Sequence, residues 1–291
     1  MTTEAVSLSQ PIHKIKVLHD LKCPMRDGTE LSTDVYMPAE GGPFPTLLTR
    51  TPYGKHLEPF VPILIHRAQQ GYAVVAQDVR GRFESPGQFY PFINEASDGH
   101  DAIEWAANQP WSTGKIATFG ASYVGLTQWQ AAQGGSPHLI ASTPQVAYSN
   151  TYHNWVYTGG AFQLGFLVGW GFAASARTHE RQFLWLPEEL HQNTLFRHLP
   201  LINTDEAAGR NVRFWKDWID HPAYDDYWRS MSPVEDHYPE IEVASYSMAG
   251  WFDVFLQGSL NNFMGMTRHG KTAEARRNQK IIVGPWIHGL G

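Results

Sequence analysis

Short runs of apolar residues alternate with helical patterns along this chain, and this alternation limits the possible folds more than any other feature. Residues 72–76 form a continuous apolar run between Gly71 and a Gln-Asp pair, and shorter apolar runs cover residues 115–119 and 139–143. Such runs are typical of strands that are buried on both faces, as in a parallel sheet. The sequence therefore predicts an α/β fold with a mainly parallel central sheet.

Helical patterns separate these runs. We expect helices over residues 60–70, 98–109 and 126–132, the first ending at Gly71 and the second at Pro110. Right-handed crossovers between parallel strands place such helices on both faces of the sheet.

The remaining segments complete the sheet and interrupt it once. Residues 15–37 are expected to form a β-hairpin around the Asp27-Gly28 pair, and residues 46–51, 241–248 and 280–283 to form further strands. Residues 145–240 are rich in glycine and aromatic residues and show helical patterns, so we interpret them as a helical insertion. The predicted domains are therefore a discontinuous α/β domain, residues 1–144 and 241–291, and the insertion 145–240.

Composition restricts the partners and the location. The 291 residues carry a formal net charge of −6, which gives no electrostatic reason to expect nucleic acid or an anionic membrane. The single cysteine, Cys23, excludes an internal disulfide and a multi-thiolate metal site. The polar N-terminus does not resemble a signal peptide, and the apolar stretch 164–176 is too short to span a membrane. We expect a cytoplasmic protein that needs no metal or other cofactor, with an oligomer possible.

The strongest chemical signal is the sequence GASYVG at residues 120–125, between a predicted strand and a predicted helix. A serine at such a turn projects its hydroxyl above the sheet edge, and the helix N-terminus supplies backbone N–H groups. The motif departs from G-x-S-x-G because glycine stands three residues after Ser122, with Val124 in the second position. The alternative is a tight structural turn with a buried serine.

A serine nucleophile needs a base, and chain position selects one among 14 histidines. His288 follows the last predicted strand, and Asp253 follows the strand before it. The order Ser122, Asp253, His288 is the order of nucleophile, acid and base in α/β-hydrolases. The backbone N–H of Tyr123 is one natural oxyanion donor, and the phenol of Tyr53, after an early strand, is the candidate for the second.

Several motifs together resemble the X-Pro dipeptidyl-peptidase-like hydrolases, the group that includes cocaine esterase and the α-amino-acid ester hydrolases. They are RTPYGK at 50–55, QDVRGR at 77–82, DGHDAIEW at 98–105, QPW at 109–111, GASYVG at 120–125, GWFD at 250–253 and GPWIH at 284–288. The resemblance covers residues 20–291 and implies an α/β-hydrolase. It implies Ser122, Asp253 and His288 as the catalytic triad, Tyr53 and the Tyr123 N–H as the oxyanion hole, and a helical cap near residues 145–240.

The resemblance also indicates the substrate. The α-amino-acid ester hydrolases use acidic residues just after the triad aspartate to hold an ammonium group, whereas residues 254–257 here are VFLQ. An apolar lining cannot stabilise a buried cation. We therefore expect a carboxylic ester with an apolar or aromatic acyl group. By matching position, Trp155, Trp170 and Phe255 are the expected acyl-pocket residues, with plain cap core as the alternative.

Two acidic clusters are interpreted as structural rather than as metal or ammonium sites. Asp225 and Asp226 are expected at the end of a cap element, and Asp98 and Asp101 to cap the predicted helix 98–109. Two other functions stay open for the chain. One is an X-Pro dipeptidyl aminopeptidase acting on short peptides, or an amide acylase, and the other is a non-catalytic truncated module on a hydrolase fold.

The length carries one further expectation. Only three residues follow His288, whereas α/β-hydrolases normally continue with a helix, and the resembled family continues into a β-rich jelly-roll domain. We expect a truncated copy with an exposed apolar sheet face, whose own activity the sequence leaves open.

Overall fold

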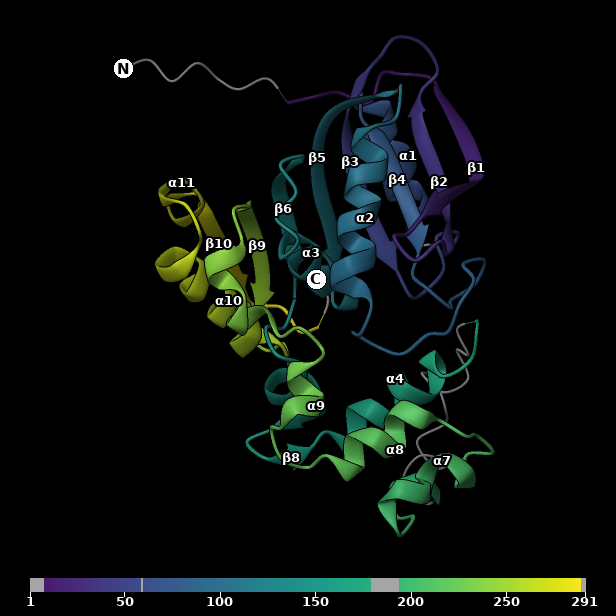
Figure 1. The fold of residues 1–291 in the computed structure, drawn as a ribbon, viewed down its shortest axis with the longest axis vertical. Helices are drawn as coiled ribbons and strands as arrows, with labels where there is room; N and C mark the ends of the chain where they lie inside the picture. The colour runs from purple at the N-terminus through teal and green to yellow at the C-terminus, as the bar shows by residue number, and fades with distance from the viewer. Residues whose placement is uncertain (1–7, 59, 179–193, 289–291) are drawn as a thin grey trace.

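The computed structural model describes residues 8–58, 60–178 and 194–288, and an eight-stranded sheet dominates it. The strand order is β1-β2-β4-β3-β5-β6-β9-β10 (Figure 1). The strands are β1 (Ile15–Pro24), β2 (Glu30–Pro38), β3 (Phe44–Thr51), β4 (Ala73–Asp78), β5 (Ser112–Ala121), β6 (Leu139–Gln145), β9 (Ala244–Gly250) and β10 (Gln279–Gly284). From β4 to β10 every neighbouring pair is parallel, and only β2 runs antiparallel to its neighbours β1 and β4, which confirms the predicted α/β class.

The predicted hairpin and strands are present with shifted ends. Strand β1 pairs with β2, and the turn between them places Gly28 at φ +83°, a conformation that suits glycine. The strand predicted over 241–248 begins only at Ala244, because Ile241 follows a short 3₁₀ turn, Tyr238–Glu240.

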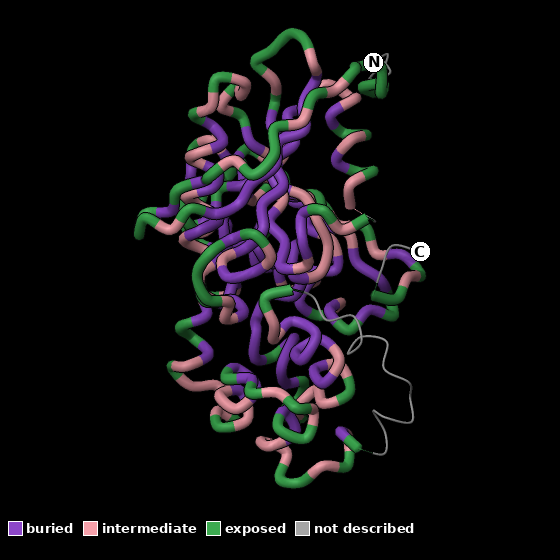
Figure 2. The backbone as a smooth tube through the Cα atoms, turned by 90° about the vertical axis from the view of Figure 1, so that its right-hand side faces the viewer, coloured by how far each residue is buried: buried purple, intermediate pink, exposed green. Residues whose placement is uncertain are grey.

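Helices cover the two faces of the sheet unequally. Helices α2 (Glu95–Ala107), α3 (Tyr123–Ala132) and α10 (Leu256–His269) lie on the side that carries the large core, and α1 (Val61–Gln69) packs on the other side against β2 and β4. Figure 2 shows the buried residues concentrated along the centre of the sheet and below it. Helix α11 (Ala273–Arg277) packs beside α10.

The sequence analysis did not predict α10, although it is the longest described helix with 14 residues. Its sequence contains Gly258 and Gly265, which lower helix propensity. Both glycines serve packing, because a Cβ at Gly265 would lie 2.0 Å from the ring of Tyr238, and a Cβ at Gly258 would lie 2.6 Å from the Cα of Tyr148. Close approach between elements therefore outweighs the local preference.

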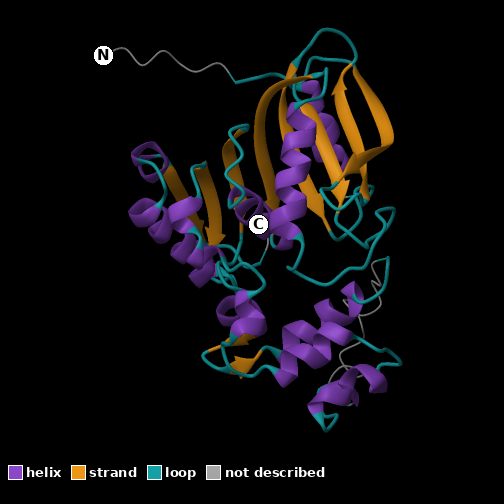
Figure 3. Ribbon diagram, in the orientation of Figure 1, coloured by secondary structure: helices purple, strands orange, loops and turns teal. Residues whose placement is uncertain are grey.

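The chain between β6 and β9 lies beyond the carboxyl ends of the parallel strands (Figure 3). Its described elements are mainly helical. They are a π-helical turn (Tyr152–Val156), β7 (Tyr157–Thr158), β8 (Ala161–Phe162), α4 (Leu164–Ala174), α7 (Thr204–Ala207), α8 (Arg213–Asp220), α9 (Asp226–Arg229) and 3₁₀ turns at Leu201–Asn203, Val234–Asp236 and Tyr238–Glu240. Helix α4 lies within the apolar stretch 164–176, and seven of its residues are buried. None of the helices within the described ranges combines the length and apolar character needed to cross a membrane.

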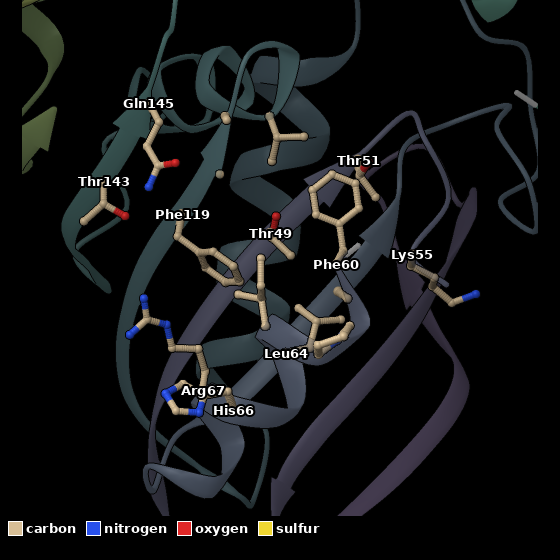
Figure 4. Close-up of a pocket in the computed structure, with 16 residues that line it drawn as sticks. Thr49, Thr51, Lys55, Phe60, Leu64, His66, Arg67, Phe119, Thr143 and Gln145 are labelled. Atoms are coloured by element: carbon tan, nitrogen blue, oxygen red, sulfur yellow. The ribbon is translucent and has the colours of Figure 1, made fainter. Parts of the chain in front are cut away.

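The face of the sheet beside α1 is partly uncovered in the described part of the chain. A pocket of about 650 Å³ lies there between α1 and strands β3, β5 and β6, with Leu64 and Phe119 among its lining residues (Figure 4). Directly paired residues point to the same face, and Gln145 of this pocket pairs with Met248, which pairs with Ile282. Ile282 is 40% exposed, so an apolar side chain is exposed on this face.

Candidate active site

Ser122 occupies a strained turn between β5 and α3. Its backbone has φ 63° and ψ −126°, a conformation that costs a non-glycine residue about 1–3 kcal/mol. Two backbone hydrogen bonds hold the turn: the Ser122 N–H donates to the Gln145 carbonyl at 2.9 Å, and the Ser122 carbonyl accepts from the Gly125 N–H at 2.8 Å. The surrounding sheet and helix thus fix the serine in the position that the sequence predicted.

The two glycines of the motif explain its unusual spacing. A Cβ at Gly120 would lie 2.2 Å from the Cγ1 of Val124, and a Cβ at Gly125 would lie 2.8 Å from the carbonyl oxygen of Gln145. Val124 therefore takes the space that Gly120 leaves free. Glycine is needed one position later, at Gly125, where α3 meets the end of β6.

His288 lies between Ser122 and Asp253. Its Nε2 is 2.9 Å from the Ser122 Oγ, and its Nδ1 is 3.0 Å from the Asp253 Oδ1. The Asp253 side chain is fully buried, and its Oδ1 also accepts the Phe255 N–H at 2.8 Å. A carboxylate at Nδ1 favours the tautomer that carries its proton there, which leaves Nε2 free to accept the serine proton.

Backbone contacts join the loops that carry the acid and the base. The Trp251 N–H donates to the Gly284 carbonyl at 2.8 Å, and the Phe252 N–H donates to the Trp286 carbonyl at 3.0 Å. A Cβ at Gly250 would lie 2.3 Å from that Trp286 oxygen, so glycine lets the loops approach this closely. The parallel pairing of β9 with β10 brings both loops to one edge of the sheet.

Tyr53 also interacts with the Ser122 side chain. Its phenol oxygen accepts a hydrogen bond from the Trp170 Nε1 at 3.1 Å and hydrogen bonds with the Ser122 side chain. Burial raises the pKa of Tyr53 above its usual value, while the hydrogen bonds and the positive charge of Arg82 act in the opposite direction. At neutral pH the phenol keeps its proton and can donate a hydrogen bond to an oxyanion.

Tyr123 is the first residue of α3, so its N–H lies in the first turn, where helices leave N–H groups without a helical acceptor. Its side chain is buried and anchored: the hydroxyl donates to the Glu95 Oε1 at 2.9 Å and accepts from the Phe92 N–H at 3.0 Å. Glu95 in turn accepts from Arg50 at 2.8 Å. This buried network fixes the residue whose N–H we predicted as an oxyanion donor.

The three predicted pocket residues are in mutual contact. The ring of Trp155 lies 4.8 Å from that of Trp170 and is stacked on that of Phe255 at 4.9 Å. Phe255 in turn presents its ring to His288 at 4.9 Å and 88°. All three side chains are buried, so they form an aromatic cluster that contacts the His288 ring through Phe255.

The acidic clusters have structural contacts, and one interpretation needs correction. Asp225 caps α9 by accepting the Tyr227 N–H, as expected of a structural role. The capping role predicted for Asp98 is wrong, because α2 begins at Glu95, three residues earlier, and Asp98 forms an ion pair with Arg80 at 2.7 Å. The helix starts early because burial of Glu95 against Arg50 fixes its first turn. Within the described ranges no group of three or more His, Cys, Asp or Glu side chains could hold a metal ion.

The sequence analysis missed two residues that support the site. Glu95 lies outside the motifs, and the sequence carries no signal for its contact with Tyr123. Arg82 lies inside the QDVRGR motif at 77–82, but the sequence does not reveal that its side chain is buried beside Tyr53. A buried arginine is rare enough that only the tertiary structure could single it out.

Known proteins share this sequence pattern and fold. The sequence model of the X-Pro dipeptidyl-peptidase (S15 family) matches residues 27–290. The cocaine esterase of Rhodococcus sp. (strain MB1 Bresler) is 34% identical over 289 residues, which cover 94% of this chain and 49% of that protein.

Two solved structures have the same fold. An aminopeptidase from a marine sediment archaeon, Thaumarchaeota archaeon, superposes with a TM-score of 0.76 at 22% identity, covering 99% of this chain and 51% of that one. An α-amino acid ester hydrolase superposes with a TM-score of 0.74 at 23% identity, covering 98% of this chain and 50% of that one. The chain thus spans about half the length of these relatives.

Proposed function

Because the chain belongs to the X-Pro dipeptidyl-peptidase (S15) family, we propose that it is a serine hydrolase that cleaves carboxylic esters through an acyl-enzyme. One observation carries this proposal. The Ser122 hydroxyl is 2.9 Å from the His288 Nε2, and the His288 Nδ1 is 3.0 Å from the buried Asp253 carboxylate. Nucleophile, base and orienting acid stand in the geometry that acyl transfer requires.

In the proposed reaction His288 removes the Ser122 proton as the Oγ attacks the ester carbonyl. The Ser–carbonyl bond forms, and the carbonyl oxygen becomes an oxyanion that accepts hydrogen bonds from the Tyr53 phenol and the Tyr123 N–H. His288 then gives its proton to the leaving alcohol. Water, deprotonated by the same histidine, attacks the acyl-enzyme, releases the carboxylic acid and restores the Ser122 hydroxyl. Asp253 stabilises the imidazolium in both halves.

An apolar or aromatic acyl group is the proposed preference. The aromatic cluster of Trp155, Trp170 and Phe255 adjoins the proposed triad, because Phe255 contacts the histidine ring. The residue after Asp253 is the exposed Val254, and the next is the buried Phe255, so this stretch offers no carboxylate to a substrate ammonium group. Esters of benzoic acid should therefore be turned over faster than esters of free amino acids.

A short X-Pro peptide is the alternative substrate, and the family name supports it. A direct comparison decides between the two. Purified protein is given p-nitrophenyl butyrate, p-nitrophenyl benzoate and an Ala-Pro p-nitroanilide at equal concentration. A higher kcat/KM on the esters supports the esterase, whereas a higher kcat/KM on the amide would establish the peptidase and overturn the ester proposal.

Ser122→Ala tests the proposed chemistry itself. We expect it to remove ester turnover and labelling by a fluorophosphonate, because both need the serine oxygen. Ser149→Ala is the matched control, since Ser149 is a buried serine outside the proposed site that hydrogen bonds with Asn154 at 2.6 Å. Turnover that persists in Ser122→Ala would refute the assignment. A folded wild-type chain that never reacts with the fluorophosphonate would instead support a non-catalytic module.

The cytoplasm is the proposed location. The only cysteine, Cys23, is buried and free, and burial raises its pKa to about 12, so it is an inert thiol that suits a reducing compartment. Fractionation of the source cells with an antibody to the chain tests this. Recovery from a secreted fraction would contradict it.

A further inference from the structure

Arg82 is a fully buried arginine next to the proposed oxyanion hole. It follows β4, and its side chain is 0% exposed. Across residues 8–58, 60–178 and 194–288, no carboxylate lies within ion-pair distance of its guanidinium, and its Nη2 has no hydrogen-bond partner. The rings of Phe83 and Phe89 lie 5.4 Å and 5.2 Å from its guanidinium carbon, but a buried cation without a carboxylate partner is still costly to the folded state. A residue retained at such a cost calls for an explanation beyond packing.

The guanidinium connects two segments that both reach Tyr53. Its Nε donates to the carbonyl of Pro52 at 2.8 Å, directly before Tyr53 in the chain. Its Nη1 donates to the carbonyl of Ala174 at 2.8 Å and to that of Ala176, at the C-terminal end of α4. Positive charge is favourable at that end of a helix.

Helix α4 also contacts the Tyr53 phenol. It carries Trp170, whose indole N–H donates to the Tyr53 oxygen at 3.1 Å. A backbone hydrogen bond accompanies these side-chain contacts, because the Phe83 N–H donates to the Arg177 carbonyl at 2.8 Å. A Cβ at Gly54 would lie 2.8 Å from the Phe83 ring, so the ring packs against the backbone of the Tyr53 loop. The loop of Tyr53 is therefore held from the backbone side by Arg82 and from the hydroxyl side by α4.

We propose that Arg82 is a positioning residue for the oxyanion hole: its guanidinium fixes the Tyr53 loop against α4 and keeps a positive charge beside the Tyr53 phenol. This inference rests on the proposed function, in which Tyr53 donates to the oxyanion. The positive charge of Arg82 acts to lower the pKa of Tyr53, against the effect of burial. A phenol with a lower pKa is a stronger hydrogen-bond donor, so the charge strengthens the contact that forms only in the transition state.

A double-mutant cycle separates this role from plain structural support. Arg82→Met retains most of the apolar stem and loses the charge and three donated hydrogen bonds. We expect it to lower kcat on p-nitrophenyl butyrate about tenfold with little change in KM, and to lower kcat much less in a Tyr53→Phe background. Arg82→Lys restores the charge without the planar fork and should recover part of the loss.

Arg80→Met is the matched control. Arg80 lies two residues away, and its guanidinium binds Asp98 and Asp27, each at 2.7 Å, rather than the Tyr53 loop. We expect its loss of kcat, whatever its size, to be the same with Tyr53 and with Phe at position 53. Equal losses for Arg82→Met in the two backgrounds would overturn the proposal.

A second readout does not depend on turnover. With 3-fluorotyrosine placed at position 53, the ¹⁹F resonance reports the ionisation of that phenol directly. We expect Arg82→Met to move the resonance and raise the pKa of the phenol, and Arg80→Met to leave both unchanged. An unchanged resonance and pKa in folded Arg82→Met would refute the positioning role. If the wild-type chain has no esterase activity but Arg82→Met still raises the pKa of the Tyr53 phenol, the proposed function is refuted and the positioning role stands.

Discussion

The two sides of Ser122 are built in different ways. On the oxyanion side, Tyr53 is held by a buried tryptophan and a loop fastened by the buried Arg82. On the base side, His288 is 34% exposed and is held by Ser122, by Asp253 and by the edge of one aromatic ring. The first side is part of the core of the molecule, and the second depends on single side-chain contacts. Substitutions on the two sides should therefore differ in their effects on kcat and on the pH dependence of turnover.

Removing the base should have the largest effect. His288→Ala deletes the group that accepts the serine proton, and loss of a triad histidine costs about 10⁴–10⁶-fold in kcat. Because the side chain is partly exposed, we expect the melting temperature to change little. Steady-state kinetics and calorimetry on the same preparation check both statements. A kcat within tenfold of wild type would show that His288 is not the base.

Removing the oxyanion phenol comes second. Tyr53→Phe deletes one donor, and we expect kcat to fall about 10²–10³-fold with KM nearly unchanged, because the contact forms mainly in the transition state. The Trp170 indole and the Ser122 side chain also lose a hydrogen-bond partner. A change confined to KM would mean that Tyr53 binds substrate rather than the oxyanion.

Removing the indole that binds the phenol should have a smaller effect. Trp170→Phe deletes the N–H donor to Tyr53, and we expect a loss in kcat of about threefold to tenfold, from one neutral hydrogen bond of about 0.5–1.5 kcal/mol. Trp155→Phe is the matched control, because its Nε1 is buried and has no hydrogen-bond partner in the described part of the chain. Equal losses in the two variants would assign the effect to lost volume, not to the hydrogen bond.

The smallest expected effect is that of Tyr53→Phe on the pH dependence of ester turnover. Burial raises the pKa of Tyr53, and the protonated phenol is the donor, so its loss of a proton lowers activity only above that raised pKa. We expect Tyr53→Phe to lower the rate of ester turnover by the same factor at every pH between about pH 6 and about pH 9. The pH at which the rate is half-maximal should stay the same. A shifted alkaline limb in this variant would show that Tyr53 ionises in the working range.

The sequence predicted local structure best where one pattern dominated. The apolar run at 72–76 is strand β4, all of whose residues are buried, since burial on both faces of a sheet leaves little choice of residue type. The run at 139–143 is strand β6, but it is not buried on both faces, because Ile140 is 51% exposed. The pattern failed for α10, where close packing demands glycines, and for the start of α2, where a buried ion pair between Glu95 and Arg50 decides the first turn. Local propensity gave way at both places to contacts with distant segments.

The candidate site divides in the same way. The turn at Ser122 could be predicted because strand, glycines and helix are consecutive in the chain, and the order of Asp253 and His288 follows from the order of the strands. Residues 120–125 and the positions after β9 and β10 thus determined the chemistry that we propose. The tertiary structure alone decided that Arg82, far from α4 in the sequence, reaches the carbonyl of Ala174, and that Trp170 reaches Tyr53. The physical reason is that packing of the whole chain, rather than the pattern of neighbouring residues, determines which distant side chains meet in the core.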